Sequence, residues 1–183
     1  MIVLDYEINW GADYSIAYSF LTAVTSSKKL SEQRKPLLVE MKRTQDFSID
    51  LFTNDTRLFH MIATMQATPA YVPIYSEALL PSGIGNLQGL SIVNVNDFGA
   101  YYNTIHASKF MLIDTTREKP GEIVTKSSFP SNTQINFAEQ IVGLFPVTKT
   151  VIYPVMYGIL ETKKIKSITD TITRFTMSFR EYF

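Results

Sequence analysis

Only two side chains in this 183-residue sequence, those of His60 and His106, have an unperturbed pKa suited to general base catalysis near neutral pH. A catalytic histidine needs an orienting carboxylate and a nucleophile within hydrogen-bonding reach, and no spacing in the sequence supplies them. We place His60 in a helix and His106 in a polar loop, and we expect both to be structural. Cysteine is absent, which excludes thiolate catalysis, disulfides and cysteine-ligated zinc or iron–sulfur sites.

The acidic and glycine-rich motifs do not build a catalytic site either. Asp50 and Asp55 flank an expected strand-to-helix corner, but capping of the helix explains Asp55 better than catalysis does. The glycine-rich stretch 83–89 precedes a β-like run, whereas a phosphate-binding loop leads into a helix, so we interpret it as a turn. The sequence therefore predicts no enzymatic activity, no cofactor and no metal site.

Aromatic residues offer a different chemistry, because their faces can stack on sugar rings. Trp10, with Tyr14 and Tyr18 nearby, could form such a platform, although large aromatic side chains are more often buried. A carbohydrate-binding module is thus one alternative function. Its stacking residues would be Trp10, Tyr71, Tyr75, Tyr101 and Tyr102.

Hydrophobic periodicity indicates a mostly β protein with one packed helix. Apolar residues alternate with polar ones over 37–51 and again around Phe175, Met177 and Phe179, as in strands with one buried face. Between these strands, a stripe at helical spacing predicts a single helix over about 54–67, which must end before Pro69. We expect the strands of 37–51 and 171–181 to belong to one sandwich.

The densest turn-forming stretch, 81–89, marks an expected domain boundary. Short β-like runs follow at close spacing, which favours a small barrel or a small sandwich. These runs are 90–95, 110–113, 122–126, 134–137 and 150–160. We therefore predict one domain made of 1–83 and 157–183, with a small β domain of 84–156 inserted into it.

The charge balance excludes several classes of partner. Seventeen basic residues match 17 acidic ones, so the chain has no overall field to attract nucleic acid or an anionic membrane. The apolar run 151–160 is far shorter than the roughly 20 residues of a membrane-spanning helix, and the N-terminus lacks the basic region of a secretory signal. We expect a soluble protein made in the cytoplasm, without nucleic-acid recognition or membrane insertion.

Charge is nevertheless distributed unevenly along the chain. The stretch 28–43 holds six basic residues and two acidic ones, whereas 44–107 holds five acidic residues and one basic one. Opposite patches on one chain allow copies to dock head to tail. Two ordinary solvated surfaces would give the same distribution, and both interpretations stay open.

A pattern spread over nearly the whole chain points to a family. Its segments are Trp10 with 20–27; 32–36 leading to Lys42, Arg43 and Phe47; the helix followed by 68–77; the tyrosine–proline strand 151–156; and the closing strand 171–181. In this pattern the chain resembles the distal tail proteins and related minor tail proteins of the tail tip of long-tailed bacteriophages.

The resemblance implies a β-sandwich related to the tail tube fold, with a packed helix and an inserted small β domain. It further implies a structural protein of the virion that forms a ring, as a hexamer, between the tail tube protein and the hub protein of the tip. Tape measure protein and tail fibres are further candidate partners. A tail tube, completion or adaptor ring protein is an alternative with the same fold.

The same resemblance suggests where subunits would meet. The polar connection from Lys28 to Lys35 is expected to reach the neighbouring subunit, with Lys28, Lys29, Glu32, Arg34 and Lys35 at the contact. Arg34 is the best single anchor, because its guanidinium can hold a carboxylate through two parallel hydrogen bonds. A solvated hairpin without a partner is the alternative.

Overall fold

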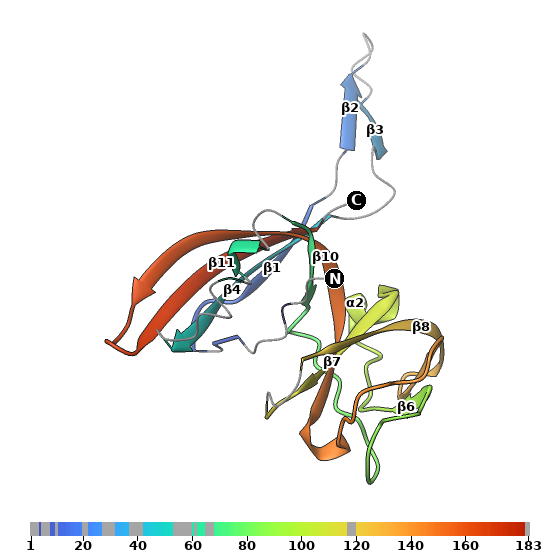
Figure 1. Cartoon of the computed structure of the whole chain (residues 1–183). Coiled ribbons are helices and arrows are strands. Elements are labelled where there is room, and N and C mark those ends of the chain that lie inside the picture. Colours follow the sequence, from blue (N-terminus) through green and yellow to red (C-terminus); the bar gives the residue numbers. More distant parts are fainter. Residues whose placement is uncertain are drawn as a thin grey trace. The chain divides into compact units, whose positions relative to one another are not determined.

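The chain forms two compact all-β units, as seen in a computed structural model (Figure 1). The structure describes residues 4, 8–9, 11–19, 22–26, 32–36, 42–52, 60, 62–64, 68–116 and 120–181, with backbone only for 22–26 and 32–36. Unit 1 comprises Met1–Glu7 and Ala70–Tyr157, and unit 2 comprises Ile8–Pro69 and Gly158–Phe183. The predominantly β class predicted from the sequence is confirmed.

The observed division differs from the predicted boundaries of 83/84 and 156/157. The first boundary lies earlier, at 69/70, because residues that follow it run beside strand β10 (Thr150–Ser167). Leu79, for example, exchanges two backbone hydrogen bonds with Ile152 and is fully buried in the core of unit 1. The N-terminal segment also belongs to unit 1, since Leu4 is buried and its N–H donates to the carbonyl of Tyr71.

Unit 2 is built on an antiparallel sheet in the order β1, β4, β11, β10. Its strands are β1 (Ser15–Ser19), β4 (Lys42–Phe52), β11 (Ile172–Glu181) and the C-terminal part of β10. The C-terminal strand β11 lies between β4 and β10. The segments 37–51 and 171–181, which were predicted to belong to one sandwich, therefore lie side by side in one sheet in their described parts.

Alternation along β4 and β11 explains the burial of one face of this sheet. Ile49 lies opposite Phe175, and both side chains are buried. The other buried apolar residues of the two strands are Phe47, Leu51, Met177 and Phe179. Each such side chain stabilises the fold by roughly 1.5–3 kcal/mol when it leaves water. The intervening residues form a polar face on the other side.

Part of the predicted helix over 54–67 is described. His60 and residues 62–64 are helical, and Ile62 is buried while His60 is exposed. The Thr64 hydroxyl donates to the His60 carbonyl, and the Thr68 N–H donates to the Thr64 carbonyl, both at i, i+4 spacing. The remaining residues of the predicted helix, Asp55 among them, lie outside the described ones.

A second, two-stranded sheet joins β2 (Thr22–Ser26) to β3 (Glu32–Pro36). The pair lies in sequence between β1 and β4, which are neighbours in the sheet of unit 2. Within the described residues, β2 and β3 pair only with each other. The polar connection predicted between strands is thus a β-hairpin.

Unit 1 contains most of the short strands expected after residue 90. Its sheet has the order β10, β7, β8, β9, β6, with β5 on the other edge of β10. These strands are β5 (Ala70–Pro73), β6 (Ile92–Asn94), β7 (Lys109–Asp114), β8 (Glu122–Ser131) and β9 (Gln134–Phe137). A short helix α2 (Tyr102–His106) and a 3-10 turn η1 (Val147–Lys149) connect them.

Hydrogen bonds close the sheet of unit 1 into a ring of strands. Leu79 pairs with Ile152 of β10, and shortly after it Pro81 pairs with Val95, just beyond β6. The segment 79–82 therefore bridges the two ends of the strand order. Of the small barrel and the small sandwich that the sequence allows, this closed circuit is that of a barrel, and its interior holds an apolar core including Phe110.

Strand β10 belongs to both units, and Gly158 marks the point where it enters unit 2. A Cβ atom on Gly158 would lie 1.9 Å from the carbonyl oxygen of Arg180 on β11. Glycine in a strand interior often marks such a close approach of two backbones. The interruption of the apolar run at Gly158 is therefore required by the packing of β10 against β11.

Candidate functional site

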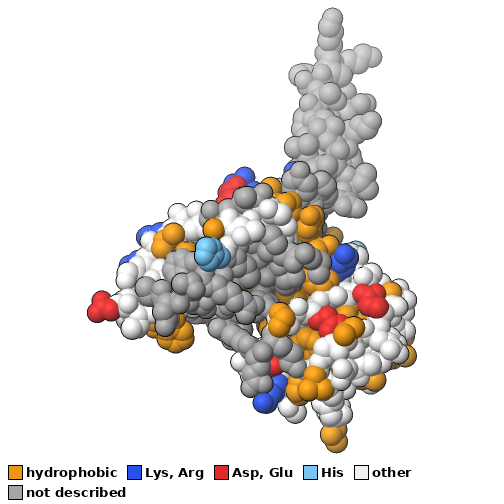
Figure 2. Space-filling view, in the orientation of Figure 1, with side chains coloured by type: hydrophobic (Ala, Val, Ile, Leu, Met, Phe, Trp, Pro, Cys, Tyr) orange, Lys and Arg blue, Asp and Glu red, His pale blue; other side chains and the backbone are white. Residues whose placement is uncertain are grey.

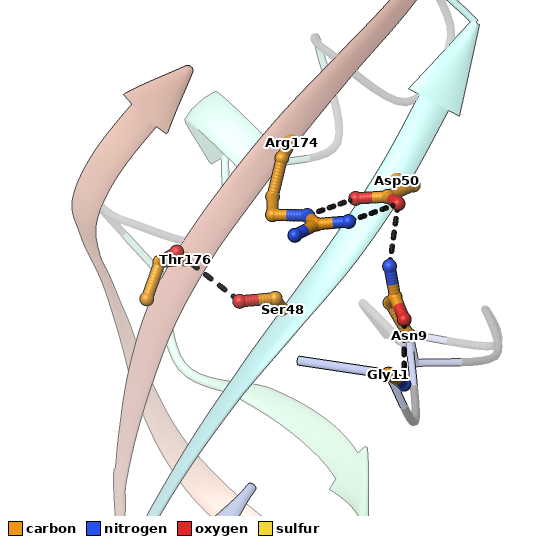
Figure 3. A network of polar contacts seen from close by, with 6 residues as sticks. All are labelled: Asn9, Gly11, Ser48, Asp50, Arg174 and Thr176. Atoms are coloured by element: carbon orange, nitrogen blue, oxygen red, sulfur yellow. Dashed lines mark hydrogen bonds and ion pairs between the residues drawn. The ribbon is translucent and has the colours of Figure 1, made fainter. Parts of the chain in front are cut away.

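The best-defined polar cluster of unit 2 lies on the polar face of the sheet and is centred on Asp50 (Figure 3). Arg174 of β11 donates to both carboxylate oxygens of Asp50 on β4, with Nε–Oδ1 at 2.6 Å and Nη2–Oδ2 at 2.8 Å. The amide of Asn9 donates to Asp50 Oδ2, and its own Oδ1 accepts the N–H of Gly11. Three segments far apart in sequence are thereby joined through one carboxylate.

This geometry gives Asp50 a structural task. The bidentate hydrogen bonds from Arg174 hold the pKa of the Asp50 carboxyl below its ordinary value of 3.8, against the opposing effect of partial burial. The group is therefore ionised at neutral pH and is occupied by donors, so it is poorly suited to accept a proton from a substrate. The expected absence of a catalytic role for Asp50 remains a prediction.

Further ion pairs cross the same sheet, and two of them reach β4. Arg43 of β4 donates to Glu181 at the end of β11, with both side chains largely buried. Lys163 of β10 reaches Asp46 of β4 at 2.9 Å, and this pair is much more exposed. Like the Asp50–Arg174 pair, each of these pairs joins side chains on two different strands, which lie more than a hundred positions apart in sequence. The pairs therefore help to hold the strands in register.

The histidine expected in a polar loop lies instead at the end of α2. His106 is exposed, and its ring centroid is 4.4 Å from that of Tyr102 one turn earlier. The prediction of a loop was wrong because α2 buries polar residues, Asn103 and Thr104, and therefore carries no apolar stripe. The other histidine, His60, is helical as expected, and the two histidines lie in different units.

Helix α2 is held by Glu77, a residue that the sequence did not single out. Its carboxylate is 8% exposed and accepts the backbone N–H groups of Asn103 and Thr104, together with the Asn103 side-chain amide. The two N–H groups are among those left without partners at the start of a helix. Glu77 is thus a cap supplied from 26 residues earlier in the chain.

The tyrosines proposed for sugar stacking do not form one exposed platform. Tyr75 is buried and packs edge-on against Tyr153, so it cannot stack on a ligand in this structure. Tyr102 is half exposed, whereas Tyr71 and Tyr101 are only partly so. Trp10 lies outside the described residues.

The residues predicted for subunit contact fall on the β2–β3 hairpin. Glu32, Arg34 and Lys35 lie on β3, where Arg34 is paired with Val24 and Lys35 with Ala23. Lys28 and Lys29 lie outside the described residues, in the connection between the two strands. Three of the five positions thus lie on one described strand, and the role of all five in assembly stays a prediction.

No family model matches the chain, and neither does any curated protein. Among the described residues, no three His, Asp or Glu side chains gather in a way that could hold a metal ion. Neither described helical stretch has the length and apolar character needed to cross a membrane.

Proposed function

We propose that the protein is a structural subunit of a bacteriophage tail tip, where it forms a ring between the tail tube and the hub. The observation that carries the proposal is the order of the two units along the chain. Unit 1 is inserted between strands of one sheet, and β11 returns from beyond it to lie between β4 and β10. The distal tail resemblance implies such an insertion with a returning C-terminal strand.

The polar interactions of unit 2 are consistent with a structural task. Its best-defined carboxylates, Asp50 and Glu181, are each held by an arginine from another strand. Such pairs position strands rather than substrates. The ring would use six copies, and the tail tube protein and the hub protein would be its neighbours in the virion.

Subunit contacts in the ring are assigned to the β2–β3 hairpin. Its strands pair only with each other among the described residues, which leaves its edges available to a neighbouring copy. The stretch 28–43 is rich in positive charge, and 44–107 is rich in negative charge. A basic hairpin on one subunit would thus meet an acidic region on the next, and such a contact repeats head to tail around a ring.

Electron microscopy of the purified protein tests this proposal. We expect rings of uniform symmetry for the parent protein, and weaker ring formation after reversal of Lys28, Lys29 and Arg34 to Glu. The loss should be largest at low salt, where screening of the contact is least. Light scattering at about 20 mM and about 500 mM salt, between which the Debye length differs about fivefold, measures the same effect in solution.

A matched control reverses Arg117, Lys119 and Lys149 to Glu. It changes the net charge by the same amount, but its three positions belong to the sequence range of unit 1 and not to that of the hairpin. Rings should form normally in this control. Strictly monomeric parent protein at high concentration would contradict the ring, and equal assembly by both triple variants at low salt would move the contact elsewhere.

Two alternatives would be separated by their partners. A tube, completion or adaptor protein would also form rings, and would differ only in which tail proteins bind it. A carbohydrate-binding module would bind glycans as a monomer, and a glycan array measures that directly. The burial of Tyr75 removes one of the five residues on which that alternative rests.

A further inference from the structure

Two segments of unit 1 contain no charged residue. The stretches 78–96 and 140–148 contain no Asp, Glu, Lys, Arg or His, although 19% of the whole chain is charged. Both segments carry large apolar side chains that face solvent. These are Leu80, Ile84, Leu90, Ile92, Val142 and Leu144, which we call the apolar end.

Backbone hydrogen bonds bring the two segments together. The Leu87 N–H donates to the Phe145 carbonyl, the Gly89 N–H to the Ile141 carbonyl, and the Ile141 N–H to the Leu90 carbonyl, at 2.8–3.0 Å. The ribbon they form has two faces. Leu87, Ile141 and Phe145 point into the core of unit 1 and are almost fully buried. The apolar end includes the residues on the other face.

The exposed side chains are presented by ordered turns. Both carboxylate oxygens of Glu122 accept hydrogen bonds, one from the Val142 N–H at 2.8 Å and one from the Gly143 N–H at 2.7 Å. A Cβ atom on Gly143 would lie 2.5 Å from the ring of Phe145, so the turn requires glycine there. Val142, which is 76% exposed, is therefore fixed in an outward position.

Ile84 is presented in a similar way at the tip of its loop. It is fully exposed and lies between Gly83 and Gly85, which both have positive φ angles that favour glycine. Hydrophobic side chains are visible at the lower tip of unit 1 in Figure 2, over the green loop of Figure 1. Exposing an isoleucine completely gains nothing for the isolated barrel, so this side chain suits a contact outside it.

We propose that the apolar end is a two-fold contact between unit 1 of one copy and unit 1 of a second copy. From their exposed fractions, the six residues together expose roughly 600 Å² of surface. With their polar neighbours included, this approaches the ~800 Å² that each partner contributes to a stable interface. A two-fold contact places a patch against itself, so a patch with charges of one sign would repel its mate. None of the six side chains of the apolar end is charged, and both oxygens of the neighbouring Glu122 carboxylate are occupied by the Val142 and Gly143 N–H groups.

This contact is separate from the ring of the proposed function. It involves unit 1 instead of the β2–β3 hairpin, and it joins copies in pairs instead of head to tail. A tail ring held through the hairpin could therefore be paired with a second ring through the apolar end. The same contact would dimerise the protein if the ring proposal were wrong.

The absence of cysteine allows a direct test by cross-linking. Single variants Val142→Cys and Ile84→Cys are oxidised mildly, and the fraction of covalent dimer is measured on a non-reducing gel. We expect at least one of them to give a dimer at micromolar concentration. Ile165→Cys, an exposed apolar position on β10 in unit 2, is the control and should give about tenfold less.

A second measurement does not depend on cysteine. The double variant Ile84→Asp with Val142→Asp should keep the unfolding midpoint of the parent, because both side chains are exposed, while its dissociation constant for pairing rises about tenfold or more in analytical ultracentrifugation. In this measurement, the double variant and the parent with which it is compared both also carry Glu at positions 28, 29 and 34, so that ring formation does not mask pairing. Equal cross-linking of all cysteine variants, or unchanged sedimentation, would overturn the contact. Binding of the parent monomer to phosphatidylcholine vesicles would also overturn it, since it would assign the apolar end to lipid.

Discussion

At the scale of single residues, the Asp50–Arg174 pair should contribute more to stability than the neighbouring Asp46–Lys163 pair. The first is bidentate, is supported by Asn9 and is less exposed, whereas the second is a single contact between more exposed side chains. We expect Arg174→Ala to lower the free energy of unfolding of unit 2 by more than Lys163→Ala does. Lys163→Ala should cost less than about 0.5 kcal/mol. Urea denaturation of both variants measures the difference, and equal losses would contradict it.

The same pair predicts how stability changes with pH. Because the pKa of Asp50 is lowered in the folded protein, its contribution is complete above the unfolded pKa near 4 and is lost as the pH falls through the folded value. Asp50→Asn should therefore be less stable than the parent at pH 7, and the difference should shrink below pH 4. A difference that stays constant from pH 7 to pH 3 would show that ionisation of Asp50 does not matter. Chemical denaturation at each pH supplies the measurement.

Some of these residue roles are visible in the sequence, and others are not. The alternation around Phe47 and Phe175 predicts which side chains are buried, because a strand has a period of two. The pairing of Asp50 with Arg174 is not predictable in this way, since it depends on the register between strands that are 124 positions apart. Gly158 appears in the sequence only as a break in an apolar run. Its reason, the close approach of Arg180, exists only after β10 and β11 have paired.

At the scale of elements, α2 should depend on Glu77. The carboxylate replaces water for two backbone N–H groups of the helix and for the amide of Asn103, in a nearly buried position. We expect Glu77→Ala to cost about 2–4 kcal/mol in the unfolding of unit 1, because it leaves several buried donors without an acceptor. Glu139→Ala is the control, since Glu139 accepts one N–H at an exposed site and should cost about 1 kcal/mol or less.

The measurement for Glu77 is the denaturation midpoint of unit 1, followed by hydrogen exchange at residues 103 and 104. Faster exchange confined to these amides would show that only the cap has been lost. If Glu77→Ala proves no less stable than Glu139→Ala, the helix is held by its packing and not by the carboxylate. The variant Glu77→Gln keeps the shape of the side chain but not its charge, and its amide presents a donor where Thr104 also donates. Its denaturation midpoint should therefore lie between those of Glu77→Ala and the parent protein.

Elements with a regular apolar pattern are the ones that the sequence predicts. The runs around 110–113, 122–126 and 134–137 each correspond to a strand, β7, β8 and β9. Helix α2 is missed because its inward face is polar and its cap comes from a distant residue. The apolar end is missed for a related reason: apolar residues near 84 and 142 look like core until the hydrogen-bonding partners of their backbone show which of them face outward.

At the scale of the whole molecule, the two units should unfold in separate transitions, since each has its own core. Leu4 belongs to the core of unit 1 although it is separated in sequence from the rest of that unit, and Met177 belongs to the sheet of unit 2. Leu4→Ala should thus lower the midpoint of one transition, and Met177→Ala that of the other. Each variant should lower the free energy of unfolding of its own unit by about 2–5 kcal/mol, the usual range for truncating a buried side chain to alanine.

Fluorine labels read the two transitions separately. In protein labelled with 3-fluorotyrosine, the signal of Tyr153 reports on unit 1, and in protein labelled with 4-fluorophenylalanine, the signal of Phe175 reports on unit 2. Each signal is assigned by its loss in a single Tyr-to-Phe or Phe-to-Leu variant. Deleting 171–183 removes β11 from between β4 and β10, so it should abolish the Phe47 signal of folded unit 2 and leave that of Tyr153 unchanged. If the deletion shifts both signals equally, or if Leu4→Ala and Met177→Ala move both transitions together, the units fold as one cooperative body. Strand β10, which continues from one unit into the other, would then be the element that couples them.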